Sequence, residues 1–125
     1  MSILANRYAS DQMKDIWSPR SKIIAERRLW ITVMKTQSEL GFDIPAPAIK
    51  DYERVLENID LDSIDKRERE LRHDVKARID EFNSLAGHQY IHVGMTSRDL
   101  TENIEALQIR QGLELVHTKV VALLA

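Results

Sequence analysis

The chain has 125 residues, of which 43% are hydrophobic and 30% charged, with four glycines and three prolines. This composition is typical of one soluble helical unit and excludes a disordered or fibrous chain. The formal net charge is -2, and acidic and basic residues are interleaved. A nucleic-acid-binding surface is therefore not expected, whereas a small anionic ligand stays open.

Cysteine is absent, so the chain offers no disulfide, no thiolate metal site and no thiol nucleophile. Residues 1–8 contain no apolar run of signal-peptide length. No stretch approaches the roughly 20 apolar residues that span a bilayer. We therefore expect a cytoplasmic protein without a membrane anchor.

The first predicted helix runs from about residue 20 to residue 40. Ser18-Pro19 precedes it, apolar residues recur at steps of three and four, and Gly41 is suited to end it. The recurring apolar residues are Ile23, Trp30, Val33, Met34 and Leu40.

A shorter helix is predicted over about 47 to 58. Pro45 interrupts the chain, and Pro47 stands where the first turn of a helix tolerates proline. The apolar pattern of this segment is Ile49, Tyr52, Val55 and Leu56.

A single third helix is predicted from the Asp60–Asp62 region to Gly87. Asp60 and Asp62 supply N-cap chemistry, and Gly87 is suited to end the helix. Its apolar face is expected to consist of Ile64, Leu71, Val75, Ile79 and Phe82, opposite a charged and hydrated face.

Residues 90–93 are predicted to form an extended loop, because Tyr-Ile-His-Val is β-branched and aromatic and lies between glycines. Thr96 to Asp99 then reads as a capping box that opens a long helix. Along that helix, apolar residues step by four, three, four and three, the spacing of a helix bundle or coiled coil. These residues are Ile109, Leu113, Val116, Val120 and Leu123, and we expect them to be exposed in a single chain. The sequence stops within this pattern, so we expect the helix to be cut short.

The four histidines differ in what their surroundings allow. His117 lies among charged residues of the last predicted helix, which favours a solvated or packing role. His88 and His92 have the i, i+4 separation of a helical zinc pair, but the flanking glycines argue against a helix and no third ligand is evident. We therefore expect no metal site.

Arg72-His73-Asp74 has two interpretations. On a helix, three successive polar residues cannot share one face, so at least one turns toward the apolar side. The group is then either a surface ion-pair cluster or a substrate clamp with His73 near a cleft. A second candidate is Gly94-Met95-Thr96-Ser97, where hydroxyls and the amides of a helix start together favour an anion, although any capped helix carries half of this motif.

The sequence resembles the adenylosuccinate lyase family of the fumarase/aspartase superfamily. The similarity lies in Arg72-His73-Asp74-Val75 and in the run from Ile91 to Asp99, and it extends to Arg7-Tyr8, Ile16-Trp17 and Glu26-Arg27. The same motifs differ in the argininosuccinate lyase and fumarase branches. The resemblance covers essentially the whole chain.

This resemblance implies an all-α fold, with residues 1–95 as an N-terminal helical domain and residues 96–125 as the start of a long central-bundle helix. It implies a homotetramer without a cofactor that eliminates fumarate from adenylosuccinate, giving AMP, and from succinyl-aminoimidazole carboxamide ribotide in purine biosynthesis. Arg7 and Tyr8 would hold the phosphate, and Thr96 and Ser97 a succinyl carboxylate. Arg72, His73 and Asp74 would contact substrate, with His73 beside the leaving nitrogen, and His92 would line the same pocket.

The family's serine-bearing loop, Gly-Ser-Ser-x-Met-Pro-x-Lys-x-Asn, and its Gly-Arg-Thr-His segment with the acid histidine are not found in the 125 residues. We therefore expect an N-terminal fragment without turnover of its own. Two other hypotheses remain, namely another superfamily member such as a cycloisomerase, and a helical interaction module without chemistry.

Overall fold

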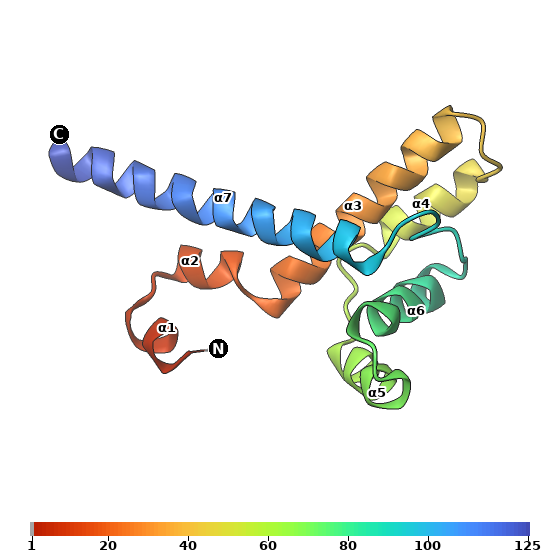
Figure 1. The fold of residues 1–125 in the computed structure, drawn as a ribbon, viewed down its shortest axis with the longest axis horizontal. Coiled ribbons are helices and arrows are strands. Elements are labelled where there is room, and N and C mark those ends of the chain that lie inside the picture. The colour runs from red at the N-terminus through yellow and green to blue at the C-terminus, as the bar shows by residue number, and fades with distance from the viewer. Residues whose placement is uncertain (1) are drawn as a thin grey trace.

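The computed structural model describes residues 2–125, and this part of the chain consists of helices, turns and loops without a strand. The predicted all-helical class is confirmed. The helices are α1 Ile3–Tyr8, α2 Asp11–Ile16, α3 Pro19–Glu39, α4 Ala46–Arg54, α5 Leu61–Leu71, α6 Asp74–Ala86 and α7 Ser97–Leu124 (Figure 1). Figure 1 shows α7 extending well beyond the other helices on one side, with α3 to α6 gathered around its N-terminal end.

The long helix α3 forms as the sequence predicts. The hydroxyl of Ser18 accepts a hydrogen bond from the backbone N–H of Ser21 at 3.1 Å, and Pro19 occupies the first turn. Beyond the last turn, Gly41 adopts a φ of +95°, a conformation that suits glycine. Of the predicted apolar face, Ile23, Trp30 and Met34 are buried.

Helix α4 ends earlier than predicted, at Arg54 instead of near residue 58. The side chain of Arg27 explains the difference. Its Nη1 donates to the carbonyl oxygens of Val55, Leu56 and Asn58 at 2.9 to 3.0 Å, so these carbonyls turn toward α3. A continuing helix would use them internally.

The predicted single helix over 60–87 is wrong, because the structure divides it into α5 and α6. Asp60 caps α5 and Gly87 ends α6 at a φ of +75°, as predicted. Between them, Arg72 has the left-handed conformation, with φ 53° and ψ 35°, and His73 is extended. Leu71, predicted to be buried, is therefore exposed at the end of α5.

Two short helices precede α3, and the sequence patterns did not indicate them. Ser2 caps α1 and Ser10 caps α2, each by accepting backbone N–H groups of the first turn. Neither helix contains a buried residue. Each helix has only six residues, too few for an apolar periodicity of two turns, which explains why that pattern gave no signal.

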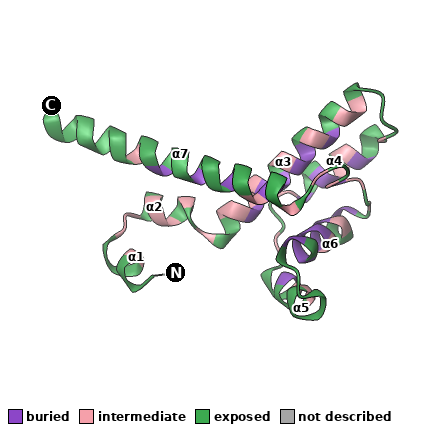
Figure 2. Cartoon of the chain, viewed as in Figure 1, coloured by how far each residue is buried: buried purple, intermediate pink, exposed green. Residues whose placement is uncertain are grey.

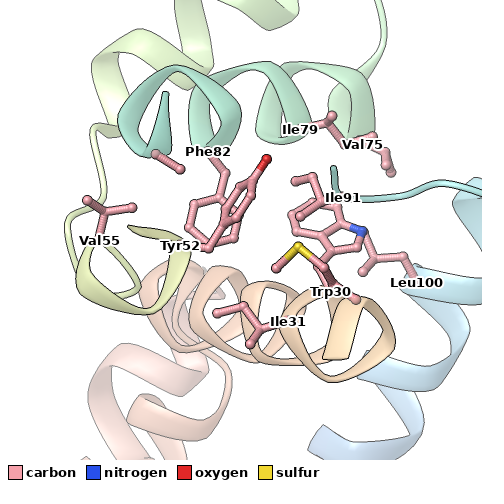
Figure 3. Close-up of a cluster of buried hydrophobic side chains, with 11 residues drawn as sticks. Trp30, Ile31, Tyr52, Val55, Val75, Ile79, Phe82, Ile91 and Leu100 are labelled. Atoms are coloured by element: carbon pink, nitrogen blue, oxygen red, sulfur yellow. The ribbon is translucent and has the colours of Figure 1, made fainter. Parts of the chain in front are cut away.

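The main core lies where α3, α4 and α6 meet the loop before α7 (Figure 3). Trp30 stacks on Phe82 with ring centroids 6.3 Å apart, and Tyr52 meets Phe82 edge-on at 5.0 Å. Val75, Ile91 and Leu100 close the core beside the Trp30 indole. The first turns of α6 and α7 and the loop between these helices thus share one side of the core.

Helix α7 is packed only near its start. Its buried residues are Leu100, Ile104, Gln108 and Gly112, and its distal half is exposed (Figure 2). The five residues of its distal apolar face have exposed fractions from 46% to 83%, which confirms that they are exposed in a single chain. They are Ile109, Leu113, Val116, Val120 and Leu123. No helix within residues 2–125 has both the length and the apolar character needed to cross a membrane.

Candidate functional site

Arg72, His73 and Asp74 lie at the junction of α5 and α6, not along a helix. Arg72 is the C-cap of α5 and His73 is the N-cap of α6. His73 Nδ1 accepts the backbone N–H of Lys76 at 3.2 Å, which leaves Nε2 to carry the proton of the neutral ring. The premise that these residues share one continuous helix, on which both interpretations rested, is therefore wrong, while Asp74 does form an ion pair with Arg78. The three residues form a turn with exposed side chains.

Asp74 connects this turn to the interior of the molecule. Its Oδ2 accepts from Arg78 Nη2 at 3.4 Å, and Arg78 Nε donates to the buried Glu26 at 2.7 Å. Partial burial raises the pKa of the Asp74 carboxyl, but the Val75 amide and Arg78 lower it more, so the net pKa lies below its ordinary value. Asp74 is therefore held as a carboxylate.

The N-terminus of α7 provides the second part of the site. The predicted capping box is present, and its carboxylate arm is the hydrogen bond from the Thr96 backbone N–H to Asp99 Oδ2 at 2.8 Å. Ser97 begins the helix and is half-buried. The capping box uses the amides of Thr96 and Asp99, so this helix start can offer an anion the amides of Ser97 and Arg98 and the hydroxyls of Thr96 and Ser97.

His92 lies in the loop that connects the end of α6 to the start of α7. Residues 91–94 form a turn, so the loop prediction is confirmed and only its extended shape is wrong. The His92 φ is +64°, and its Nδ1 accepts the indole N–H of Trp30 at 3.1 Å. Burial lowers the pKa of His92, the Asp99 carboxylate opposes this, and His73 and Lys76 lower it further. The same side chain therefore responds to the charges of both helix starts.

We call Arg72, His73, Asp74, His92, Thr96 and Ser97 the paired-N-terminus site. The core beneath it explains the grouping, because Val75 in the first turn of α6 and Leu100 in the first turn of α7 pack around Ile91 and Trp30 (Figure 3). The side chain of Gln37 in α3 also donates to the Val93 carbonyl at 3.0 Å and holds the turn to α3. Six of the eight residues predicted for the site thus lie at the starts of α6 and α7, at the adjoining end of α5 or in the turn before α7.

Backbone strain is concentrated at this site. Within residues 2–125, the non-glycine residues with positive φ are Arg72 and His92. A left-handed conformation costs an ordinary residue about 1–2 kcal/mol, and such strain clusters at functional positions. Both residues were also candidates for the site on sequence motifs alone. Their backbone conformation supports the same assignment independently of those motifs.

An open depression of about 640 Å³ adjoins the site on the α5 side. Its lining includes Arg72, His73 and Asp74, together with Asp65, Glu68 and Arg69. Two guanidinium groups thus face three carboxylates. A bound anion would be held by directed donors such as Arg72 and not by a positive field.

Arg7 and Tyr8 do not join the paired-N-terminus site in this chain. They end α1, are exposed, and lie at the other end of the molecule from α6 (Figure 1). His117 is exposed on the distal half of α7. His88 is not helical, as predicted, and its Nε2 lies 2.8 Å from Asp51 Oδ2. Among residues 2–125, no group of three or more His, Asp or Glu side chains could hold a metal ion.

Sequence reasoning missed the buried charged network beneath the site. Arg27 Nη2 contacts Glu81 Oε2 at 2.5 Å, and the Arg27 guanidinium lies 4.4 Å from the centre of the Phe82 ring. Burial raises the pKa of Glu26 and lowers that of Arg27, although each has a partner of opposite charge. One feature of the sequence could have indicated this network. Glu26 and Arg27 lie between Ile23 and Trp30, two positions of a predicted apolar face.

Comparison with known proteins tests the resemblance. The chain is 34% identical over 120 residues to the adenylosuccinate lyase of Schistosoma mansoni, covering 94% of this chain and 25% of that protein. It is related by sequence to adenylosuccinate lyases. It is also 32% identical over 123 residues to the enzyme of Saccharomyces cerevisiae and 26% identical over 114 residues to that of Archaeoglobus fulgidus. These alignments cover 94% and 91% of this chain and 26% of each relative.

No protein-family model matches the chain. The chain spans about a quarter of the length of the adenylosuccinate lyases to which it is similar. The predicted resemblance to this family is confirmed by several relatives from distant organisms.

Proposed function

We propose that this chain is the N-terminal part of an adenylosuccinate lyase, which eliminates fumarate from adenylosuccinate to give AMP and from succinyl-aminoimidazole carboxamide ribotide. Two observations support the proposal. The chain is similar to proteins of that name over nine-tenths of its length. The observation that carries the site assignment is the pair of strained residues, Arg72 and His92, beside two helix N-termini.

The chemistry of the substrate fits the donors available. Adenylosuccinate carries a phosphate and two carboxylates, which require hydrogen-bond donors at separate points. Thr96, Ser97 and the first amides of α7 would hold a succinyl carboxylate, and Arg72 would pair with a second anionic group. His73, with its proton on Nε2, would donate toward the leaving nitrogen.

Asp74 and His92 would complete the substrate contacts from either side of His73. The Asp74 carboxylate, held by Arg78, can accept a hydrogen bond from a substrate N–H or hydroxyl group. His92 would line the pocket. The proposed reaction is a proton-transfer elimination that uses no cofactor.

Arg7 and Tyr8 are proposed to hold the nucleotide phosphate. Because they lie far from the paired-N-terminus site of their own chain, this role requires an assembly in which they approach the site of a second chain. A cytoplasmic homotetramer is proposed as that assembly. The exposed distal apolar face of α7 supports association, since a patch of this kind is unfavourable in water.

The experiment that tests this proposal compares substrates on the full-length gene product that carries this chain. We expect fumarate release from adenylosuccinate and no cycloisomerisation of a muconate substrate. Turnover of muconate alone would instead support the cycloisomerase hypothesis. The 125-residue chain by itself is expected to release no fumarate, because it spans about a quarter of its relatives.

A helical interaction module without chemistry is the second candidate, and the distal apolar face of α7 is the observation that favours it. This hypothesis predicts self-association but no turnover of either substrate by the full-length product. Both candidates predict association of that product, so the activity assay separates them: fumarate release supports the lyase, and association without turnover supports the module.

A further inference from the structure

Trp30 has the most unusual polar contact of the core. Trp30 is 1% exposed, and its indole N–H donates to a partner outside the apolar cluster, His92 Nδ1, at 3.1 Å. The two rings meet edge-on, at an interplanar angle of 85° and a centroid distance of 6.0 Å. A buried indole N–H without an acceptor would be costly, so this contact is part of the packing of α3.

The direction of this hydrogen bond determines the state of His92. An indole N–H can donate but cannot accept, so Nδ1 must present a lone pair. In the neutral imidazole the proton is then on Nε2. Protonation at Nδ1 would set two N–H groups against each other and leave the buried indole without an acceptor.

The surroundings of His92 are consistent with this state. Burial lowers the pKa of His92, Asp99 of α7 opposes this, and His73 and Lys76 at the start of α6 lower it further. The left-handed backbone of His92 and the hydrogen bond from Gln37 to the next residue, Val93, fix the turn that carries the ring. The left-handed backbone of His92, the hydrogen bond from Gln37 to Val93 and the hydrogen bond from Trp30 thus together fix the position of the imidazole.

We propose that Trp30 is a positioning residue that keeps His92 neutral with its proton on Nε2, so that His92 serves the paired-N-terminus site as a hydrogen-bond donor and not as a base. This inference rests on the proposed function in one respect, namely which substrate group accepts the hydrogen bond from His92 Nε2–H. The protonation state itself is a property of the unliganded chain.

The first test uses the unmodified 125-residue chain, labelled with ¹⁵N and observed by NMR without ligand. We expect two-bond and three-bond couplings to identify the Nε2–H form of His92 at neutral pH. On acidification, the Trp30 indole N–H signal should shift with the midpoint of the His92 titration. Trp17, whose side chain is 47% exposed, is the internal reference and its indole signal should not follow that titration. A mixture of His92 tautomers, or a Trp30 signal indifferent to the titration, would overturn the proposal.

The second test removes the donor by Trp30→Phe, which keeps an aromatic ring, with Trp17→Phe as the matched control. We expect Trp30→Phe to give mixed His92 tautomers and an upward shift of its titration midpoint, and Trp17→Phe to change neither. An unaltered tautomer in a folded Trp30→Phe chain would contradict the proposal. If Trp30→Phe does not fold, the test on the unmodified chain decides. Loss of adenylosuccinate turnover in the full-length product would bear on the proposed function, whereas these spectra bear only on Trp30 and His92.

Discussion

Replacing Arg72 by glycine should stabilise the chain while impairing the site. Arg72 ends α5 with a φ of 53°, and its backbone N–H donates to the Glu68 carbonyl at 2.8 Å. Glycine can keep that hydrogen bond and adopts this conformation without steric cost. The Arg72 side chain is exposed, so its removal leaves no cavity in the core.

The magnitude follows from two opposing effects. Relief of the left-handed conformation is worth about 1–2 kcal/mol. The greater backbone freedom of glycine in the unfolded chain costs roughly 0.5–1 kcal/mol. The net expectation for Arg72→Gly is a change in the free energy of unfolding between about 0 and +1.5 kcal/mol, in contrast to a loss at an ordinary helical position.

Urea unfolding of the 125-residue chain, followed by circular dichroism, measures this change. Arg69→Gly is the matched control, because Arg69 is exposed and lies within α5. There, glycine should lower the free energy of unfolding by about 0.5–1 kcal/mol. If Arg72→Gly were destabilised as much as Arg69→Gly, the junction of α5 and α6 would not be strained and the reasoning would fail. In the full-length product, Arg72→Gly should weaken adenylosuccinate binding, since a hydrogen bond to a charged group is worth about 1.5–3 kcal/mol.

Three further predictions concern the cap, the pH dependence and the buried network. Thr96→Ala should lower the free energy of unfolding by about 0.5–2 kcal/mol because it removes the hydroxyl arm of the capping box, whereas Ser97→Ala should leave unfolding nearly unchanged and weaken catalysis by the full-length product. The pKa of His92 in the folded chain lies below its ordinary value of about 6.5, so the unfolded chain takes up more protons on acidification. The free energy of unfolding should therefore fall as pH decreases from 7 through 6. The midpoint of urea unfolding should fall less over this range in His92→Gln than in the unaltered chain. Arg27→Met should cost about 3–5 kcal/mol by leaving a buried carboxylate unpaired, whereas Arg110→Met, at an exposed ion pair, should leave the free energy of unfolding nearly unchanged in the same assay.

The sequence was sufficient where local chemistry decides the structure. Ser18-Pro19, Asp60 and the Thr96–Asp99 box set the starts of α3, α5 and α7, and Gly87 ends α6, all through contacts within a few residues. The residues proposed for the paired-N-terminus site each belong to a short motif, and their role in a site stays a prediction. Their arrangement in space was not predictable from the sequence, since it depends on Val75 of α6 and Leu100 of α7 belonging to the same core.

The sequence was insufficient where distant residues override a local pattern. The apolar spacing across Leu71 and Val75 is as regular as in one helix, and nothing local indicates the left-handed Arg72 between them. The early end of α4 depends on Arg27, 28 residues before Val55. Trp30 was expected as a core residue, but its bond to His92 spans 62 positions and has no signature in composition or periodicity.

The most direct test of the site assignment is fumarate release by the full-length gene product carrying His73→Ala beside the one carrying His117→Ala. His73 is the N-cap of α6 within the paired-N-terminus site, whereas His117 is exposed on the distal half of α7. With melting temperature as the control for folding, we expect His73→Ala to reduce turnover by about 10²-fold or more, the usual contribution of a positioned proton-transfer group. His117→Ala should retain the activity of the unaltered protein. Equal losses in both variants, or full activity in His73→Ala, would contradict the assignment.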